Sequence, residues 1–192
     1  MTAKKTDRKE LLNNIIEVEF DMFQRVRTAE TCLCKDRPET FKAMREITHS
    51  VLSTETLESY LEDLEKAGSE GRNLLMEKYA RMDDQIPPLK TNPVIDDIVK
   101  AESQWMRELS GKYPRVFRGT SGSFEVYLSS ELETYSDKTL ESYFEDILEA
   151  QREGENLAEQ RYTRLFQRMG YTSIAEVEGE VNKDRNDKLY QR

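Results

Sequence analysis

The sequence has little of what membrane-spanning or secreted proteins need. It holds 2 Cys, 5 Pro and 8 Gly among 192 residues, and no apolar run approaches the roughly 18 residues of a spanning helix. The single residue between Cys32 and Cys34 suits neither a structural disulfide nor a secreted disulfide framework. The N-terminal segment also lacks an apolar signal region. We therefore expect reduced thiols, no membrane partner and a cytoplasmic location.

Basic residues are in deficit as well, with 29 Lys and Arg against 38 Asp and Glu and a net charge of −9. This charge repels phosphate backbones, and no cluster of Lys and Arg is interleaved with aromatic residues, so we expect no nucleic-acid partner. The content of 35% charged and 36% apolar residues, with so few Gly and Pro, is typical of long helices with one solvated face. The sequence predicts an all-α protein of a length that fits one domain.

The chain repeats itself at an offset of 83 residues. The segments Thr56 to Met82 and Thr139 to Leu165 share 14 identities in 27 positions without a gap. The same offset superposes Glu19 on Glu102 and Phe41 on Phe124, so the duplication covers nearly the whole length. Such self-similarity indicates two copies of one structural unit.

Apolar spacing and capping residues predict three helices in each copy, the third of them long. Asp7, Ser53, Asn92 and Ser136 are the expected N-caps. We expect a single domain with a first repeat at 7–82, a linker at 83–92, a second repeat at 93–170, and a short helix and tail at 171–192. The halves are expected to form one helical bundle about an approximate two-fold axis, with two separate units as the alternative.

Two carboxylates interrupt the apolar stripes of the first helix of each copy. Glu19 lies at the centre of the stripe that includes Ile15 and Met22, and Glu102 lies at the centre of the equivalent stripe before Trp105. A lone buried carboxylate costs several kcal/mol, so each acid must be paired, protonated or bound to a ligand.

The long third helices carry a cation at the edge of their apolar face, Lys78 in the first copy and Arg161 in the second. One interpretation pairs Glu19 with Lys78 and Glu102 with Arg161 as buried ion pairs that fix helix register. The other brings both acids to the two-fold axis, where they grip a polar or cationic ligand.

Other non-apolar residues recur in both copies. Tyr60 and Tyr143 lie at the edge of the core face, where a phenol can bury its ring and reach a polar partner. Gly71 and Gly154 lie on the stripe itself and suggest a close crossing of the long helices, with core packing as the simpler explanation for all of these residues. Asn73 and Asn156 point away from the stripe, so they bond a loop or mark an irregularity.

Candidate ligand-binding residues also occur where the copies differ. Arg115 and Arg118 precede a run of small residues and a helix N-terminus, a combination that suits a carboxylate or phosphate but also an ordinary surface loop. Arg45 and Glu131 fall on core-facing stripes and are expected to pair across the two-fold axis. The residues expected to contact a ligand are thus Glu19, Glu102, Tyr60, Tyr143, Lys78, Arg161, Arg45, Trp105, Arg115 and Arg118.

A metal site is not expected. A di-iron bundle needs Glu-x-x-His twice, and the chain has a single histidine, His49. Cys34 and His49, with Cys32, are too few and wrongly spaced for a tetrahedral zinc site. We expect no cofactor, and His49 is interpreted as a hydrogen-bonded packing residue.

The segments IIEVEFDMFQ, LESYLEDLEKAGSEGRNLLMEKYARM and FEVYLSSELETYS resemble the bacterial family called domain of unknown function 4125. The resemblance covers nearly the full length and implies relatedness, but no activity, cofactor or site residue.

The first functional hypothesis is a bacterial binding or accessory module that holds a small polar molecule, or presents a surface to a protein partner, between its repeats. A helical enzyme that uses Glu19 or Glu102 as general base is the second, although no nucleophile-base pair, phosphate loop or metal set is evident. A structural adaptor is the third. A cavity of several hundred Å³ at the centre of the bundle favours the first two over the adaptor.

Overall fold

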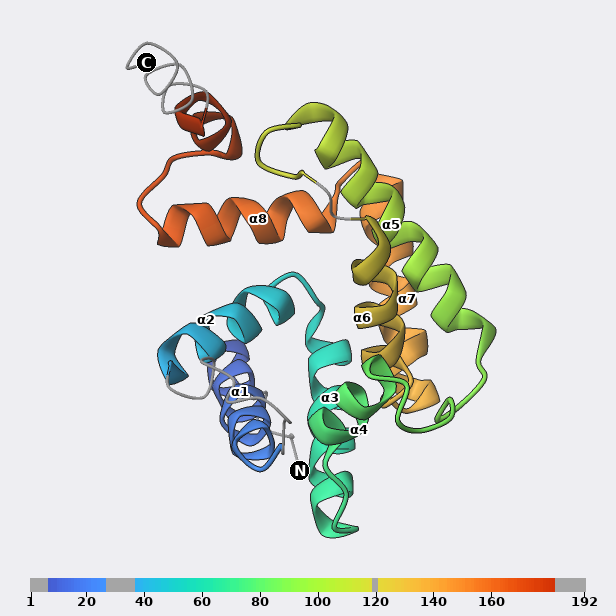
Figure 1. Ribbon diagram of the computed structural model, residues 1–192. Coiled ribbons are helices and arrows are strands. Elements are labelled where there is room, and N and C mark those ends of the chain that lie inside the picture. The colour runs from blue at the N-terminus through green and yellow to red at the C-terminus, as the bar shows by residue number, and fades with distance from the viewer. Residues whose placement is uncertain (1–6, 27–36, 119–120, 182–192) are drawn as a thin grey trace.

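The computed structural model describes residues 7–26, 37–118 and 121–181, and every regular element within these ranges is a helix (Figure 1). The predicted all-α fold is confirmed. The helices in chain order are α1 (Arg8–Gln24), α2 (Pro38–His49), α3 (Thr54–Ser69), α4 (Leu74–Met82), α5 (Pro93–Lys112), α6 (Ser121–Leu132), α7 (Asp137–Glu153) and α8 (Leu157–Arg168), and residues 174–181 are also helical.

Helix starts follow the capping residues in the sequence. Asp7, Ser53, Asn92 and Ser136 each accept a hydrogen bond from a backbone N–H in the first turn of the helix that follows. Pro93 occupies the first position of α5, where its missing N–H costs nothing. These four residues cap their helices as predicted, and residues 83–92 contain no helix.

The long third helix of each copy is broken, so the described residues of each half form four helices rather than the predicted three. Gly71 (φ 72°) and Gly154 (φ 70°) end α3 and α7 in the left-handed conformation. Arg72 N–H donates to Ala67 O at 2.8 Å and Glu155 N–H donates to Ala150 O at 2.7 Å, which closes each helix end.

The predicted role of the two glycines was wrong. A Cβ added at Gly71 or Gly154 would meet nothing within 4 Å, so no helix crosses close to either residue. Glycine is required because a side chain disfavours positive φ.

The two asparagines begin the next helices. The Oδ1 atoms of Asn73 and Asn156 accept from the backbone N–H three residues later, which caps α4 and α8. Their Nδ2 atoms donate to the carbonyls of Met22 at 2.8 Å and of Trp105 at 3.4 Å. Each asparagine therefore both restarts the chain as a helix and ties it to the first helix of its half.

Alanine substitutions around the first break should have opposite effects three residues apart. Gly71→Ala should destabilise the protein by about 1 kcal/mol, because Ala is strained at positive φ. Gly68→Ala, inside α3 and with open space around its Cβ, should stabilise it by about 1 kcal/mol. Urea denaturation of both variants measures this, and two effects of the same sign would show that the φ of Gly71 does not decide its identity.

The helices pack in pairs that recur in both halves. Helix α1 packs on α2, α3 and α4, and α5 packs on α6, α7 and α8. Between the halves, α3 packs on α7, α4 on α6 and α2 on α8, and Figure 1 shows α6 beside α4 and α8 above α2. The site described below lies at the α4–α6 contact.

The α3–α7 contact is held by reciprocal hydrogen bonds. Thr56 Oγ1 donates to Asp146 at 2.7 Å, and Thr139 Oγ1 donates to Asp63 at 2.6 Å. Both threonines are fully buried. The donors and the acceptors of the two bonds each differ by 83 residues, the offset of the sequence repeat.

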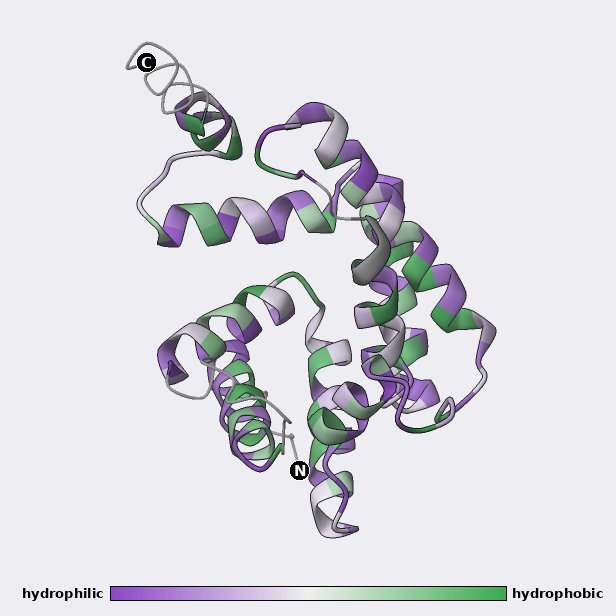
Figure 2. Cartoon of the chain, viewed as in Figure 1, coloured by the Kyte–Doolittle hydropathy of each residue, from purple (hydrophilic) through white to green (hydrophobic). Residues whose placement is uncertain are grey.

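Apolar faces of the helices turn inward, and Figure 2 shows hydrophobic and hydrophilic residues interspersed along the helices. The core includes Leu11, Ile15, Leu57, Leu64, Ile98, Leu140 and Ile147, all essentially inaccessible. None of the helices in the described ranges combines the length and the hydropathy that crossing a bilayer requires.

Candidate ligand-binding site

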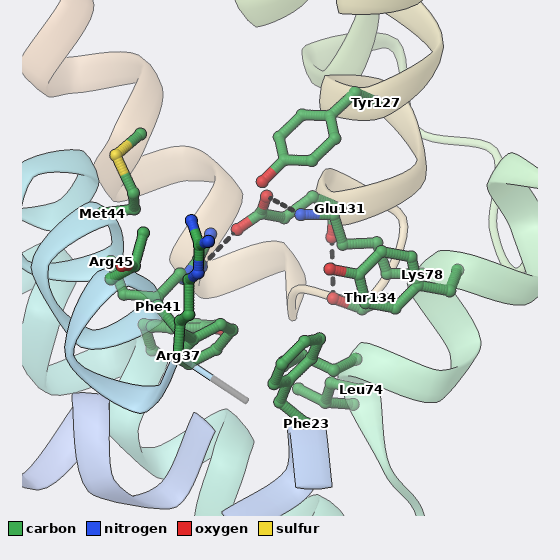
Figure 3. A pocket seen from close by; sticks show the side chains of 14 residues that line it. Phe23, Arg37, Phe41, Met44, Arg45, Leu74, Lys78, Tyr127, Glu131 and Thr134 are labelled. Atoms are coloured by element: carbon green, nitrogen blue, oxygen red, sulfur yellow. Dashed lines mark hydrogen bonds and ion pairs between the residues drawn. The ribbon is translucent and has the colours of Figure 1, made fainter. Parts of the chain in front are cut away.

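A cavity of about 290 Å³ lies between the helices of the first half and α6 of the second half (Figure 3). Its apolar wall consists of Phe23, Phe41, Met44, Leu74, Leu75 and Tyr79. Its polar wall consists of Arg45, Tyr60, Lys78, Tyr127, Glu131 and Thr134, with Arg37 and Thr40 at the exposed edge. The volume lies at the lower end of the range for small-molecule sites, and the combination of apolar walls with a few convergent polar groups is typical of them.

Glu131 on α6 joins two cations at the polar wall. Its Oε1 accepts from Arg45 Nη2 at 2.6 Å, and its Oε2 accepts from Lys78 Nζ at 2.6 Å. All three side chains are at most 8% exposed. Figure 3 shows the carboxylate between the two cations, with the ring of Tyr127 on one side and Phe23 and Leu74 on the opposite side. The expected pairing of Arg45 with Glu131 is confirmed.

Glu19 lies behind Arg45 and is fully buried, as its position on the stripe predicted. It accepts from Arg45 Nε at 2.9 Å and from Nη2 at 2.5 Å, a two-point contact with a planar guanidinium. The hydroxyl of Tyr60 donates to the same carboxylate at 2.7 Å. The predicted pair of Glu19 with Lys78 was therefore wrong, because Arg45 of α2 holds Glu19 and Lys78 turns to Glu131.

His49 completes the group around Glu19. Its Nε2 lies 3.1 and 3.2 Å from the two carboxylate oxygens of Glu19 and 3.1 Å from Nη2 of Arg45. Because the carboxylate can only accept, we assign the ring proton to Nε2, which donates to Glu19. Its Nδ1 is buried and has no hydrogen-bond partner within the part of the chain that the structure describes. The interpretation of His49 as a hydrogen-bonded packing residue agrees with this geometry.

Lys78 also lies over an aromatic face. Its Nζ is 3.6 Å from the ring centroid of Tyr127, close enough for a strong cation–π contact. Tyr127 is 37% exposed, whereas the Lys78 side chain beneath its ring is only 5% exposed.

The network holds both acids ionised. Burial alone would raise the pKa of Glu19, but Arg45 and then His49 stabilise its carboxylate and lower the pKa from 4.5 to about 2. Burial likewise opposes ionisation of Glu131, but Arg45 and Lys78 bring its pKa well below the usual value. Burial and the charge of Glu19 raise the pKa of the Tyr60 phenol, which therefore remains a donor at neutral pH.

The second half has a simpler cluster. Glu102 is fully buried and accepts from Arg161 Nη1 at 2.8 Å and from the hydroxyl of Tyr143 at 2.8 Å. The predicted pair of Glu102 with Arg161 is confirmed as a contact. Within the described residues Glu19 and Glu102 share no hydrogen-bonding partner, so the two acids do not form one site.

Three other candidate residues lie away from the cavity. Trp105 is a buried core residue of α5 and does not line the cavity. The backbone N–H groups of Arg115 and Val116 donate to Glu178, so a carboxylate of the same chain already occupies the anion site expected there. Arg118 is exposed in the same loop.

Cys32, Cys34 and His49 are the residues that were considered for a zinc site. Within the described ranges no three His, Cys, Asp or Glu side chains gather closely enough to hold a metal ion. Cys32 and Cys34 lie outside those ranges, and His49 is engaged by Glu19.

Sequence reasoning missed the aromatic and aliphatic wall of the cavity and the role of Tyr127. The sequence does indicate the charged network, because the two repeats carry different residue types at the positions that form it. Arg45 and His49 correspond to Leu128 and Leu132, and Glu131 corresponds to Thr48. A charge in one copy opposite an apolar or small residue in the other marks a feature that the second copy does not need.

A second hollow of about 770 Å³ lies between α1 and the α3–α4 turn. Its lining includes exposed charged side chains such as Asp21, Arg25 and Glu65 and exposed backbone at Gly68 and Gly71. It is an open surface groove, so the cavity at the α4–α6 contact is the candidate site.

Fold and site together define an all-helical protein with a cavity bounded by a buried charged network. The family model described as "Protein of unknown function (DUF4125)" matches residues 9–179, and the chain belongs to this family, as its resemblance suggested. No curated protein and no solved structure gives a significant match.

Proposed function

We propose that the protein is a binding module that holds one small molecule in the cavity between its two halves. The observation that supports this function is the cavity itself, about 290 Å³ in volume with an apolar wall and a charged end. A designed cavity of roughly 150 Å³ already holds a benzene ring, so this volume suits a molecule with a ring and a short chain. A structural adaptor has no need of such a cavity.

The chemistry of the site favours binding over catalysis. A general base is most effective when its pKa lies near the working pH, and a pKa of about 2 leaves Glu19 a very weak base. It is also fully buried behind Arg45 and does not line the cavity. The raised pKa of Tyr60 keeps its phenol protonated.

The differences between the halves support one site per chain. Arg45 and His49 of the first copy correspond to Leu128 and Leu132 of the second, and Glu131 of the second copy corresponds to Thr48 of the first. We also propose that the two repeats are related by an approximate two-fold axis. This arrangement is supported by the exchange of contacts between halves, in which α4 on α6 corresponds to α8 on α2. A cytoplasmic location in a bacterium is likewise proposed, from the composition and the family resemblance.

Partly filling the cavity should weaken binding without unfolding the protein. Thr40 is an exposed residue of the first turn of α2 that lines the cavity, and Glu39 is an exposed neighbour that does not. In a two-dimensional NMR titration with 4-phenylbutan-1-ol, Thr40→Trp should weaken binding by about tenfold or more, and Glu39→Trp should leave it unchanged. Shifts that arise elsewhere, or equal binding by both variants, would refute the proposed site.

A further inference from the structure

We infer that the ligand of this cavity carries a carboxylate, received by Lys78 and Arg45, on an apolar body. This inference rests on the proposed function and names the ligand class of the same site. It follows from a count of the hydrogen-bond donors and acceptors that face the cavity.

The carboxylate oxygens of Glu131 at the polar wall already accept most of the hydrogen bonds that they can. Glu131 Oε1 already accepts from Arg45 and, at 3.2 Å, from the hydroxyl of Tyr135, and Oε2 accepts from Lys78. A carboxylate offers about four acceptor positions, so three of them are filled. The backbone carbonyl of Glu131 accepts from the hydroxyl of Thr134. A ligand ammonium therefore finds little free capacity on the one carboxylate of the cavity wall, and the acceptors left to it are uncharged hydroxyl oxygens.

The donors are in excess. Lys78 has three N–H donors: one donates to Glu131, and the ammonium also faces the ring of Tyr127, which leaves at least one N–H for a ligand. The Nη1 group of Arg45 donates no hydrogen bond to a described residue. It is not fully buried, so a ligand or solvent can reach it. Both side chains line the cavity. At least three N–H groups of the cationic side chains of Lys78 and Arg45 can therefore donate to a ligand.

Charge favours an anion over a cation. Within the network, Glu19 and Glu131 balance Arg45 and Lys78, so the buried part is neutral without a ligand. Arg37 at the cavity edge adds an exposed positive charge. Because the network itself is neutral, the preference between an anion and a cation depends on Arg37 and on the unused N–H groups of Arg45 and Lys78. A carboxylate gains charge-assisted hydrogen bonds, which are roughly twice as strong as neutral ones.

The opposite wall fixes the body of the ligand. Phe23 and Phe41 stack with ring centroids 4.4 Å apart, and Leu74 lies on the same side of the cavity. These groups offer no polar atom, so the part of the ligand that faces them must be apolar. An arylalkanoate or a short alkanoate meets both requirements.

Three molecules with one body and three head groups test the inference. NMR titrations at pH 7 should give 4-phenylbutanoate a Kd about tenfold or more below that of 4-phenylbutan-1-ol, and 4-phenylbutylamine should bind more weakly than the alcohol. Equal binding of the acid and the alcohol, or preference for the amine, would overturn the head-group assignment and leave the proposed function standing. Failure of all three to bind would overturn both.

Variants at Lys78 separate recognition from folding. Lys78→Gln should reduce the preference for the acid over the alcohol to within about threefold, because one charged donor is lost, and Lys78→Arg should retain it. The affinity of each variant for the neutral alcohol reports whether the cavity is intact. A full acid preference in Lys78→Gln with unchanged alcohol binding would overturn the role of Lys78. The comparison of head groups on the unmodified protein needs no variant and stands if Lys78→Gln fails to fold.

Discussion

Glu131→Gln is expected to lower the free energy of unfolding by about 4 kcal/mol, because one carboxylate neutralises two buried cations. Glutamine keeps the shape and one acceptor but removes the charge. Arg45 keeps Glu19 as a partner, whereas Lys78 has no other carboxylate among its ion pairs within the described residues. Since the whole domain is stable by only about 5–15 kcal/mol, the loss is large. Urea denaturation followed by circular dichroism measures it.

Glu125→Gln on the same helix is the matched control. Glu125 is exposed, so its substitution should change the stability by no more than about 0.5 kcal/mol. If Glu131→Gln were as mild as Glu125→Gln, the network would not carry the buried charge balance, and the donor count that assigns a carboxylate ligand would lose its basis.

Acid should unfold the protein through the same network. The pKa of Glu19 falls from 4.5 in the unfolded chain to about 2 in the folded protein, so folding favours the ionised form. The resulting stability, about 3 kcal/mol, is fully present above about pH 5 and is lost as the pH falls through 2. The lowered pKa of Glu131 acts in the same direction. Unfolding free energies measured in urea between pH 7 and pH 2 should therefore fall steeply below pH 5.

Glu19→Gln tests the assignment of this pH dependence. The variant should be less stable than the wild type at pH 7, and the difference should shrink by about 3 kcal/mol toward pH 2, where the wild-type carboxylate also loses its charge. Parallel pH profiles of the two proteins would mean that Glu19 does not titrate with folding.

Most helix starts could be predicted from the sequence because capping residues act locally. Asp7, Ser53, Asn92 and Ser136 each bond an N–H within the first turn, and no tertiary contact is needed to place them. The breaks after α3 and α7 were missed because the apolar period continues across them. The local signal is the order Gly then Asn two residues later, in which Gly71 ends one helix and Asn73 begins the next.

The residues of the candidate site could be predicted from the sequence only in part. A helical projection places Glu19 and Glu102 on the apolar faces of their helices correctly, because the helical period alone decides which residues share a face. It gives no distance between helices, and so it paired Glu19 with Lys78 when Arg45 of α2 lies across the carboxylate. The cavity depends on how α6 approaches α4, and no pattern within either helix encodes that approach.

Native mass spectrometry of the protein purified without denaturation from its own cells tests the ligand-binding account most directly. We expect a reproducible mass excess of one small carboxylate per chain, absent from Thr40→Trp prepared in the same way and present in Glu39→Trp. A clean unliganded mass for the native protein, or an excess that persists equally in Thr40→Trp, would contradict the assignment of the cavity as the ligand site.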